Sequence, residues 1–299
     1  NGGWMGGSIV YGQRSGMPGR EGYDLRSDGI RFGIDHAFGD YVFGAALGSG
    51  WGNTDFDDGR SKQDAKHRAF TLYGLWRGNV HWYAEGLMGL GQLDFDLQRW
   101  STVANALASA RRKGDQQYGS FSVGYTQRND SYELTGYGRV EGNRTTLDAY
   151  RENGLGIYDL TYRRQRIETS LAAVGVEGSY HGKLGRHAIR PFWSLEYRDA
   201  LGDSGNAAIN YAVQPSTGDY LLALHGYADR MWALGGGFDL ELARGWQMSF
   251  QYRREESNGL RNNVFGLRVV FGQGGGTPAL MLTPAQYKDM VAEAPPDED

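Results

Sequence analysis

Apolar and polar residues alternate with a period of two along most of this chain. In the stretch 246–253 the apolar positions are Trp246, Met248, Phe250 and Tyr252, and between them lie Gln247, Ser249, Gln251 and Arg253. Successive side chains of a β-strand point to opposite faces. Each such stretch therefore predicts a strand with one apolar face and one polar face.

Twelve segments show this alternation. Their approximate cores span residues 3–13, 25–37, 41–52, 66–77, 80–97, 117–128, 131–142, 165–180, 187–199, 224–241, 246–254 and 263–271. The connections between them are short at 38–40, 78–79, 129–130, 181–186 and 243–245, and long and polar at 14–24, 53–65, 98–116, 143–164, 200–223 and 255–262. Because short and long connections alternate strictly, all the short turns would lie at one end of an antiparallel sheet and all the long loops at the other.

This plan is typical of bacterial outer-membrane proteins. In lipid every backbone group must be paired within the protein, so the sheet has to close. Most segments also reach the roughly 9–11 residues that a tilted strand needs to span a bilayer. The sequence therefore predicts an all-β fold over residues 1–271: a closed, membrane-spanning, antiparallel up-and-down barrel of 12 strands. An even strand number places both termini at the periplasmic, short-turn end and the long loops outside the cell.

A soluble β-sandwich or solenoid would show the same alternation, and composition helps to separate the two. Aromatic residues make up 13% of the chain, while the mean hydropathy is -0.56. No helix-forming stretch is available to cover so much apolar strand surface. Aromatic residues also lie near the segment ends, as an interfacial girdle requires; they are Trp4, Tyr41, Trp76, Trp82, Trp100 and Trp246. The membrane barrel is therefore favoured.

Little in the sequence indicates catalysis, a metal or a cofactor. The chain has no cysteine, which excludes disulfides and thiolate zinc sites, and its net charge of -4 gives no reason to expect nucleic acid. The acidic stretch 55–58 is interpreted as a solvated loop rather than a calcium site. The stretch 202–205 resembles the start of an esterase motif but lacks its strand–helix context. Asp229 near His225 is attributed to chance, so we expect no enzyme.

Charged residues of both signs occupy the polar faces, which would line the barrel interior. The predicted pore-lining residues are Arg31, Tyr83, Glu85, Glu133, Arg139, Glu177, Arg190, Glu196, Arg198, Asp239, Gln251, Arg253 and Arg268. Two interpretations are open. The charges could satisfy one another and simply let the barrel fold, or they could line a wet pore that holds an extended chain or a plug helix without gripping it. Inward glycines would provide room or let the sheet bend, and they are Gly33, Gly44, Gly89, Gly235 and Gly237.

Several glycine and aromatic patterns recur in a characteristic order. Gly29, Gly33 and Asp35 form a G-x-x-x-G-x-D pattern, a related glycine run starts at Gly44, and a Tyr-Gly pair follows at 73–74. A glycine-rich segment ends at Arg99, and the segments 190–202 and 232–245 complete the order. Over residues 3–271 the chain resembles the translocator β-domain of bacterial autotransporters, the type V secretion proteins.

This resemblance implies function and partners. It implies a 12-stranded outer-membrane barrel that the barrel-assembly machinery inserts and periplasmic chaperones escort. It also implies an N-terminal passenger exported through or alongside the barrel, and often a helix in the pore. The family has a linker and helix before the first strand, whereas this sequence starts at Asn1. A truncated piece of a longer protein is the favoured explanation, and Asn1-Gly2 as a cleavage junction is the weaker alternative. We expect a monomer surrounded by outer-membrane lipid and lipopolysaccharide. The alternative is a stand-alone outer-membrane channel or adhesin with functional external loops.

The last predicted strand is followed by a tail. The strand, 263–271, reads NVFGLRVVF, and by resemblance Gly266, Val269 and Phe271 form the assembly signal, although Val264 stands where a polar residue is expected. The tail, 272–299, starts with a flexible glycine-rich linker and contains a short helix over 283–293 with a Thr–Pro start. Three interpretations are open: a disordered or added tail, a periplasmic docking peptide, and a plug helix that folds back into the lumen.

Overall fold

A computed structural model describes residues 2–16, 21–78, 81–211, 220–223, 230–243, 246–257 and 259–272 of the chain. For 203–209, 211, 220–223, 243 and 272 only the backbone is described. Several residues named above lie outside the described part of the chain: Asn1, Asn79, Arg244, Gly245, His225, Asp229 and the tail 273–299.

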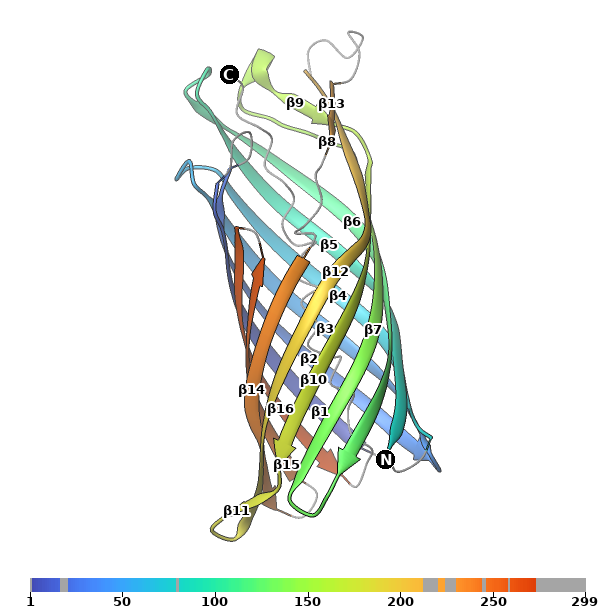
Figure 1. Cartoon of the computed structure of the whole chain (residues 1–299). Helices are drawn as coiled ribbons and strands as arrows, with labels where there is room; N and C mark the ends of the chain where they lie inside the picture. The colour runs from blue at the N-terminus through green and yellow to red at the C-terminus, as the bar shows by residue number, and fades with distance from the viewer. Residues whose placement is uncertain are drawn as a thin grey trace.

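Twelve strands form the wall of a closed barrel within this described part (Figure 1). They are β1 (Gly2–Arg14), β2 (Tyr23–Phe38), β3 (Tyr41–Phe56), β4 (Lys62–Arg77), β5 (Trp82–Ser101), β6 (Ala106–Arg128), β7 (Tyr132–Leu147), β10 (Gln165–Tyr180), β12 (His187–Tyr211), β14 (Arg230–Ala243), β15 (Trp246–Ser257) and β16 (Leu260–Gly272). Each pairs antiparallel with its neighbours in the chain, and β1 pairs with β16 along its whole length. The predicted closed, 12-stranded antiparallel barrel is confirmed.

The first and last strands close the sheet without a gap. Their register runs from Gly2 opposite Gly272 to Arg14 opposite Leu260. Closure leaves neither strand with an unpaired edge, which would otherwise be exposed to lipid or to other chains. Gly2 also pairs with Asp35, close to the short turn at Gly39, where a φ of +59° suits glycine. Both ends of the barrel sequence therefore lie at the end that holds the short turns.

Alternation along each strand separates an apolar outer face from a polar inner face. Outward side chains such as Ile34, Met88 and Leu47 are 71%, 66% and 63% exposed, which in water would be costly and in lipid is favourable. Tyr41, Trp76, Trp82 and Trp246 are also exposed, near the short-turn end. Trp4 is an exception among the predicted girdle residues, because its ring lies inside the barrel and is only 3% exposed. The prediction for Trp4 was therefore wrong.

Four of the predicted long loops, 53–65, 98–116, 200–223 and 255–262, are mostly strand within the described residues. The connection predicted over 98–116 contains the end of β5 and the start of β6, which pair as far as Ser101 and Ala106. The connections at 53–65 and 255–262 are likewise filled by strand residues up to short turns. The alternation of apolar and polar residues does not reveal these extensions, because strand residues beyond the bilayer do not face lipid. Polar residues then occupy both faces, and the period of two disappears.

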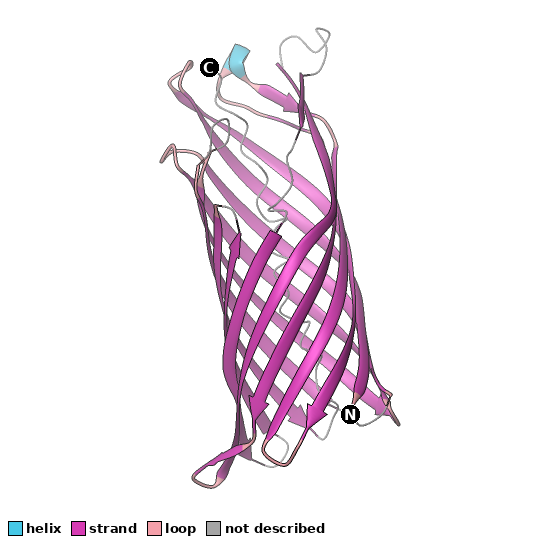
Figure 2. Cartoon of the chain, viewed as in Figure 1, coloured by secondary structure: helices cyan, strands magenta, loops and turns pink. Residues whose placement is uncertain are grey.

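The connection between β7 and β10 contains most of the remaining structure. It forms β8 (Tyr150–Arg151), the short helical turn η1 (Gly156–Tyr158) and β9 (Leu160–Tyr162), and β9 pairs with the far end of β12. Figure 2 shows η1 in cyan at the upper end of the barrel, away from the short turns. Two further short strands, β11 (Gly182–Leu184) and β13 (Tyr220–Ala223), also pair with β12. No helix among the described residues is long and apolar enough to cross a membrane.

Candidate functional site

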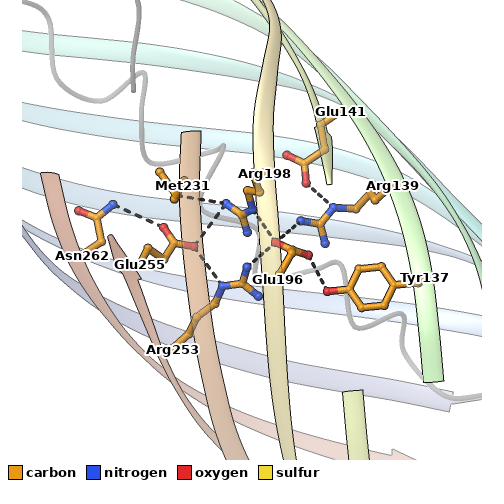
Figure 3. A network of polar contacts seen from close by, with 9 residues as sticks. All are labelled: Tyr137, Arg139, Glu141, Glu196, Arg198, Met231, Arg253, Glu255 and Asn262. Atoms are coloured by element: carbon orange, nitrogen blue, oxygen red, sulfur yellow. Dashed lines mark hydrogen bonds and ion pairs between the residues drawn. The ribbon is translucent and has the colours of Figure 1, made fainter. Parts of the chain in front are cut away.

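A fully buried carboxylate, Glu196 on β12, is the centre of a charge network inside the barrel (Figure 3). Its Oε1 atom accepts hydrogen bonds from Arg139 at 2.9 Å, from Arg198 at 2.5 Å and from Arg253 at 2.5 Å. Its Oε2 atom accepts one from the Tyr137 hydroxyl at 2.6 Å. Both oxygens of this carboxylate therefore accept hydrogen bonds.

Two further carboxylates complete the network. Glu255 lies 3.0 Å from Nε of Arg253 and 3.3 Å from Nη1 of Arg198, while Glu141 lies 2.6 Å from Nε of Arg139. Three carboxylates therefore meet three guanidinium groups, and the set is neutral. Because an unpaired buried charge is costly, this balance is what allows six ionisable side chains to lie in the interior.

The network joins strands that do not pair with each other. Arg139 belongs to β7, Glu196 to β12 and Arg253 to β15, and the strands β10 and β14 lie between them in the sheet. Residues two apart on one strand share a face, so Arg253 and Glu255 both point inward. The network therefore fastens one side of the wall by side chains, in addition to the backbone ladder.

A second charged group lies toward the short-turn end. Arg190 on β12 donates from Nε to Asp239 on β14 at 2.9 Å and is 3.9 Å from Glu133 on β7. Asp239 also accepts a hydrogen bond from Ser249, which in turn accepts one at 3.2 Å from Arg268 of β16. This series of polar contacts links β7 to β16 along the inner wall. It lies close to a cavity of about 330 Å³ whose lining residues include His181, Arg190 and Trp246.

The remaining predicted pore-lining residues lie on the same inner face but outside these two groups. Glu85 is 7% exposed, and it interacts electrostatically with Glu177 and Arg139. The ring of Tyr83 lies over Gly124, and Arg31 is close enough to His67 to interact with it electrostatically. Gln251 is half-buried on β15 between Ser249 and Arg253. Hydrogen bonds and ion pairs thus join Glu133, Arg139, Arg190, Glu196, Arg198, Asp239, Arg253 and Arg268 within the two groups. Tyr83, Glu85 and Glu177 interact with charges of these groups only at longer range, and Arg31 and Gln251 lie outside the groups. Their role in a pore stays a prediction.

An aromatic contact on the opposite wall was not anticipated. Trp4 donates its Nε1–H to the Tyr73 hydroxyl at 2.7 Å, and this hydroxyl donates to Asp35 at 3.2 Å. The two rings lie over inward glycines, since a Cβ on Gly33 would come 2.3 Å from Trp4 and one on Gly44 would come 2.2 Å from Tyr73. The predicted room above these glycines is therefore occupied by neighbouring rings.

A layer of apolar side chains also lies inside the barrel. Val10 on β1, Leu93 and Phe95 on β5, and Leu147 on β7 are each 2% exposed or less and belong to one packed cluster, which Val264 joins from β16. The same number of strands separates β1 from β7 in either direction around the barrel. The cluster therefore connects opposite walls, so that apolar side chains fill the interior at this level.

The segment between β7 and β10 is anchored by a buried ion pair to the extensions of the wall at the end away from the short turns. Both carboxylate oxygens of Glu152 accept hydrogen bonds from Arg99 of β5, at 2.9 and 2.7 Å, and Glu152 also accepts the backbone N–H of Leu160 at 3.1 Å. Arg112 donates to the backbone oxygen of Asp148 at 2.9 Å. We call residues 148–164 the cap. Its sequence carries no alternation, so only the charge complementarity of Arg99 and Glu152 could have suggested it.

The acidic stretch 55–58 is engaged within its own turn. Asp55 forms an ion pair with Lys62 at 3.0 Å, and Asp58 accepts the backbone N–H groups of Arg60 and Ser61 at 2.8 and 2.6 Å. Among the described residues no group of three or more histidine, aspartate and glutamate side chains is placed to hold a metal ion. These carboxylates therefore stabilise a hairpin turn.

Comparison with known proteins identifies the barrel. The sequence model of the Autotransporter beta-domain family matches residues 3–253. The chain belongs to this family. No curated protein is similar enough in sequence to count as a relative. The autotransporter β-domain is an outer-membrane translocator barrel, and a passenger domain is its cargo, so this chain is a transport barrel of the outer membrane.

Solved structures share the fold at low sequence identity. The translocator domain of the autotransporter NalP from Neisseria meningitidis matches with a TM-score of 0.74 and 16% identity, over 91% of this chain and 88% of that one. The β-domain of the Bordetella autotransporter BrkA matches with a TM-score of 0.66 and 15% identity, over 90% and 98%. The transport unit of AIDA-I from Escherichia coli matches with a TM-score of 0.65 and 10% identity, over 90% of each chain.

Proposed function

We propose that this autotransporter β-domain exports an N-terminal passenger, and that the charged part of its interior, outside the apolar layer, is polar yet electrically satisfied. The observation that supports this most directly is the neutral set of three carboxylates and three guanidinium groups around Glu196. A polypeptide moving past such a wall meets few unpaired charges that would hold it in place. The wall can therefore be wet and passive, and this chain needs no catalytic group of its own.

The arrangement of the connections supports one orientation. We infer that the cap and the long hairpins face outside the cell, while the short turns and both termini of residues 1–271 are periplasmic. Residues 272–299 would then be a separate periplasmic tail. An even-stranded barrel with short turns at one end follows this rule in bacterial outer membranes. Lipid and lipopolysaccharide would surround the apolar outer face of a monomer.

The position of three residues on the last strand supports a further proposal, that the barrel-assembly machinery recognises this strand. Gly266, Val269 and Phe271 lie on β16, and Phe271 is opposite Gly3 of β1 and Trp246 of β15. We infer that these three residues guide insertion, after periplasmic chaperones deliver the chain, because β16 must find β1 before the sheet can close. A strand that pairs along its full length with both neighbours is suited to that step.

Surface display of a reporter tests the proposed export. An epitope-tagged passenger is placed before residue 1 behind a signal peptide, and its digestion by protease added to intact cells is measured. We expect the epitope to be cleaved from outside, and we expect no cleavage from a matched chain in which β16 is interrupted by Leu267→Pro. A barrel that resists unfolding in detergent on gels while its epitope stays protected would overturn the proposal.

A further inference from the structure

Charged residues on the outer surface above the apolar band are mostly paired one to one. Arg111 on β6 contacts Asp96 on β5 at 3.0 Å, and Lys62 on β4 contacts Asp55 on β3 at 3.0 Å. These side chains are more than half exposed. Each of these pairs is neutral, so this part of the outer wall offers little net charge to its surroundings.

Two places differ: Arg254 and Arg261 on β15 and β16 both contact Glu256, and the wall formed by β7 and β10 adds a third arginine to such an arrangement. Arg144 of β7 and Arg166 of β10 both donate to the same oxygen of Glu168, at 2.6 and 2.8 Å. Arg164, immediately before β10, is exposed and contacts no acidic side chain among the described residues. We call Arg144, Arg164, Arg166 and Glu168 the arginine cluster. Only Arg144 and Arg166 contact Glu168, and Arg164 lies two residues before Arg166 in the chain. The cluster holds three guanidinium groups and one carboxylate, so it carries a net positive charge.

The arginine cluster lies where the apolar band ends. On β7 the outward positions from Tyr132 to Gly142 are uncharged, and Arg144 is the first charged residue beyond them. On β10 the outward positions from Tyr180 up to Ser170 are likewise uncharged, and Glu168 pairs opposite Arg144 in the sheet. Residues just outside the hydrocarbon region of a bilayer face lipid headgroups. The cluster therefore lies at headgroup level.

We propose that the arginine cluster binds a phosphate group of the phosphorylated glycolipid in the outer leaflet. Guanidinium groups match phosphate in charge and shape and can donate two parallel hydrogen bonds to it. Arg144 and Arg166 both donate to one Glu168 oxygen, and each uses its Nε–H for this hydrogen bond, which leaves other guanidinium N–H groups as donors. A phosphate seated beside Glu168 takes up the remaining donors, while Val140 and Val174 below offer exposed apolar surface to the acyl chains. This site rests on the orientation proposed above.

Binding of lipid A to the purified full-length chain in detergent tests the site. Native mass spectrometry counts bound lipid for bisphosphorylated lipid A and for its dephosphorylated form. We expect the chain to prefer the phosphorylated form, and R144Q/R164Q/R166Q to weaken binding by roughly five-fold for each arginine lost. The matched control R26Q/R111Q removes two outward arginines from one-to-one ion pairs and should leave binding unchanged.

A change in the opposite direction makes the test sharper. Glu168→Gln removes the competing carboxylate and should tighten lipid A binding, which a merely structural ion pair would not do. Equal binding by the triple variant and the unaltered chain overturns the proposal, as does competition by inorganic phosphate alone at concentrations similar to those of the lipid. Labelling a cysteine at Val103 in intact cells checks the orientation separately, so failure of the site and of the orientation can be distinguished.

Discussion

The Arg139 guanidinium of β7 reaches the Glu196 carboxylate of β12 at 2.9 Å across the intervening strand β10. This contact links strands that share no backbone hydrogen bond. Since Glu196 also holds Arg198 and Arg253, one carboxylate fixes the distance between three strands of the wall. The interior charges therefore contribute to the shape of the barrel as well as to the polarity of its lumen.

Replacing this carboxylate should destabilise the barrel strongly. Glu196→Gln leaves three guanidinium groups with two carboxylates, and breaking a buried ion pair from one side costs about 3–5 kcal/mol. The midpoint of urea unfolding in detergent micelles, followed by tryptophan fluorescence, measures the effect. Glu168→Gln, which removes an exposed carboxylate, is the control and should change stability little. The double variant E196Q/R253Q should recover part of the loss, and no recovery would argue against charge imbalance as the cause.

The contact between Trp4 and Tyr73 leads to a second prediction. Tyr73→Phe leaves the Trp4 Nε1–H buried without its acceptor, at a cost of about 1–3 kcal/mol. Trp4→Phe in the same background removes the unsatisfied donor, so the double variant should lose less stability than the sum of the two single variants. A double-mutant cycle on unfolding free energies measures this coupling. Strict additivity would show that the hydrogen bond contributes nothing.

The apolar layer predicts a closed pore. Phe95→Ala removes a side chain that is 2% exposed and belongs to the cluster joining opposite walls. Apolar constrictions resist wetting, so this variant should conduct ions in planar bilayers more readily than the unaltered barrel. Leu90→Ala removes an outward side chain of the same strand and serves as the control, with no expected change in conductance. Equal, high conductance in all three proteins would mean that the layer does not block the lumen.

How much of this could be read from the sequence depends on where a residue lies relative to the bilayer. Leu195 and Glu196 alternate because one side chain meets lipid and the other faces the interior, and such alternation predicted the strand number and topology. Beyond the lipid, Gln98 and Arg111 face water on strand ends whose sequence looks like a loop, so the full length of β5 and β6 was not predicted. Burial explains the remaining miss, since a strand sequence does not show whether an aromatic residue such as Trp4 joins the girdle or fills the interior over Gly33.

The candidate site was only partly predictable for a related reason. Alternation shows that Glu196 and Arg253 point inward, because residues on one face of a strand share a direction. It does not show which inward charges meet, since that depends on barrel shear and on strands that are far apart in sequence. Glu85 and Glu196 look alike in the sequence, yet only Glu196 is surrounded by guanidinium groups. The pairing of charges had to come from three-dimensional structure.

The Arg99–Glu152 ion pair should strengthen the docking of the cap, which β9 and backbone hydrogen bonds to β6 also hold. Glu152→Ala leaves Arg99 without its bidentate partner and removes the acceptor for the Leu160 N–H, so the cap should open from the wall more often. Arg151 and Arg164 are exposed, and a loosened segment enters a protease more easily than a docked one. Trypsin added to intact cells should therefore cut this variant faster than the unaltered barrel, with fragments ending at residues 151 and 164. Glu168→Ala, which breaks an exposed pair on the same wall, is the control and should be cut at the unaltered rate. Cleavage that is equally fast in the unaltered barrel would show that the cap is not docked there.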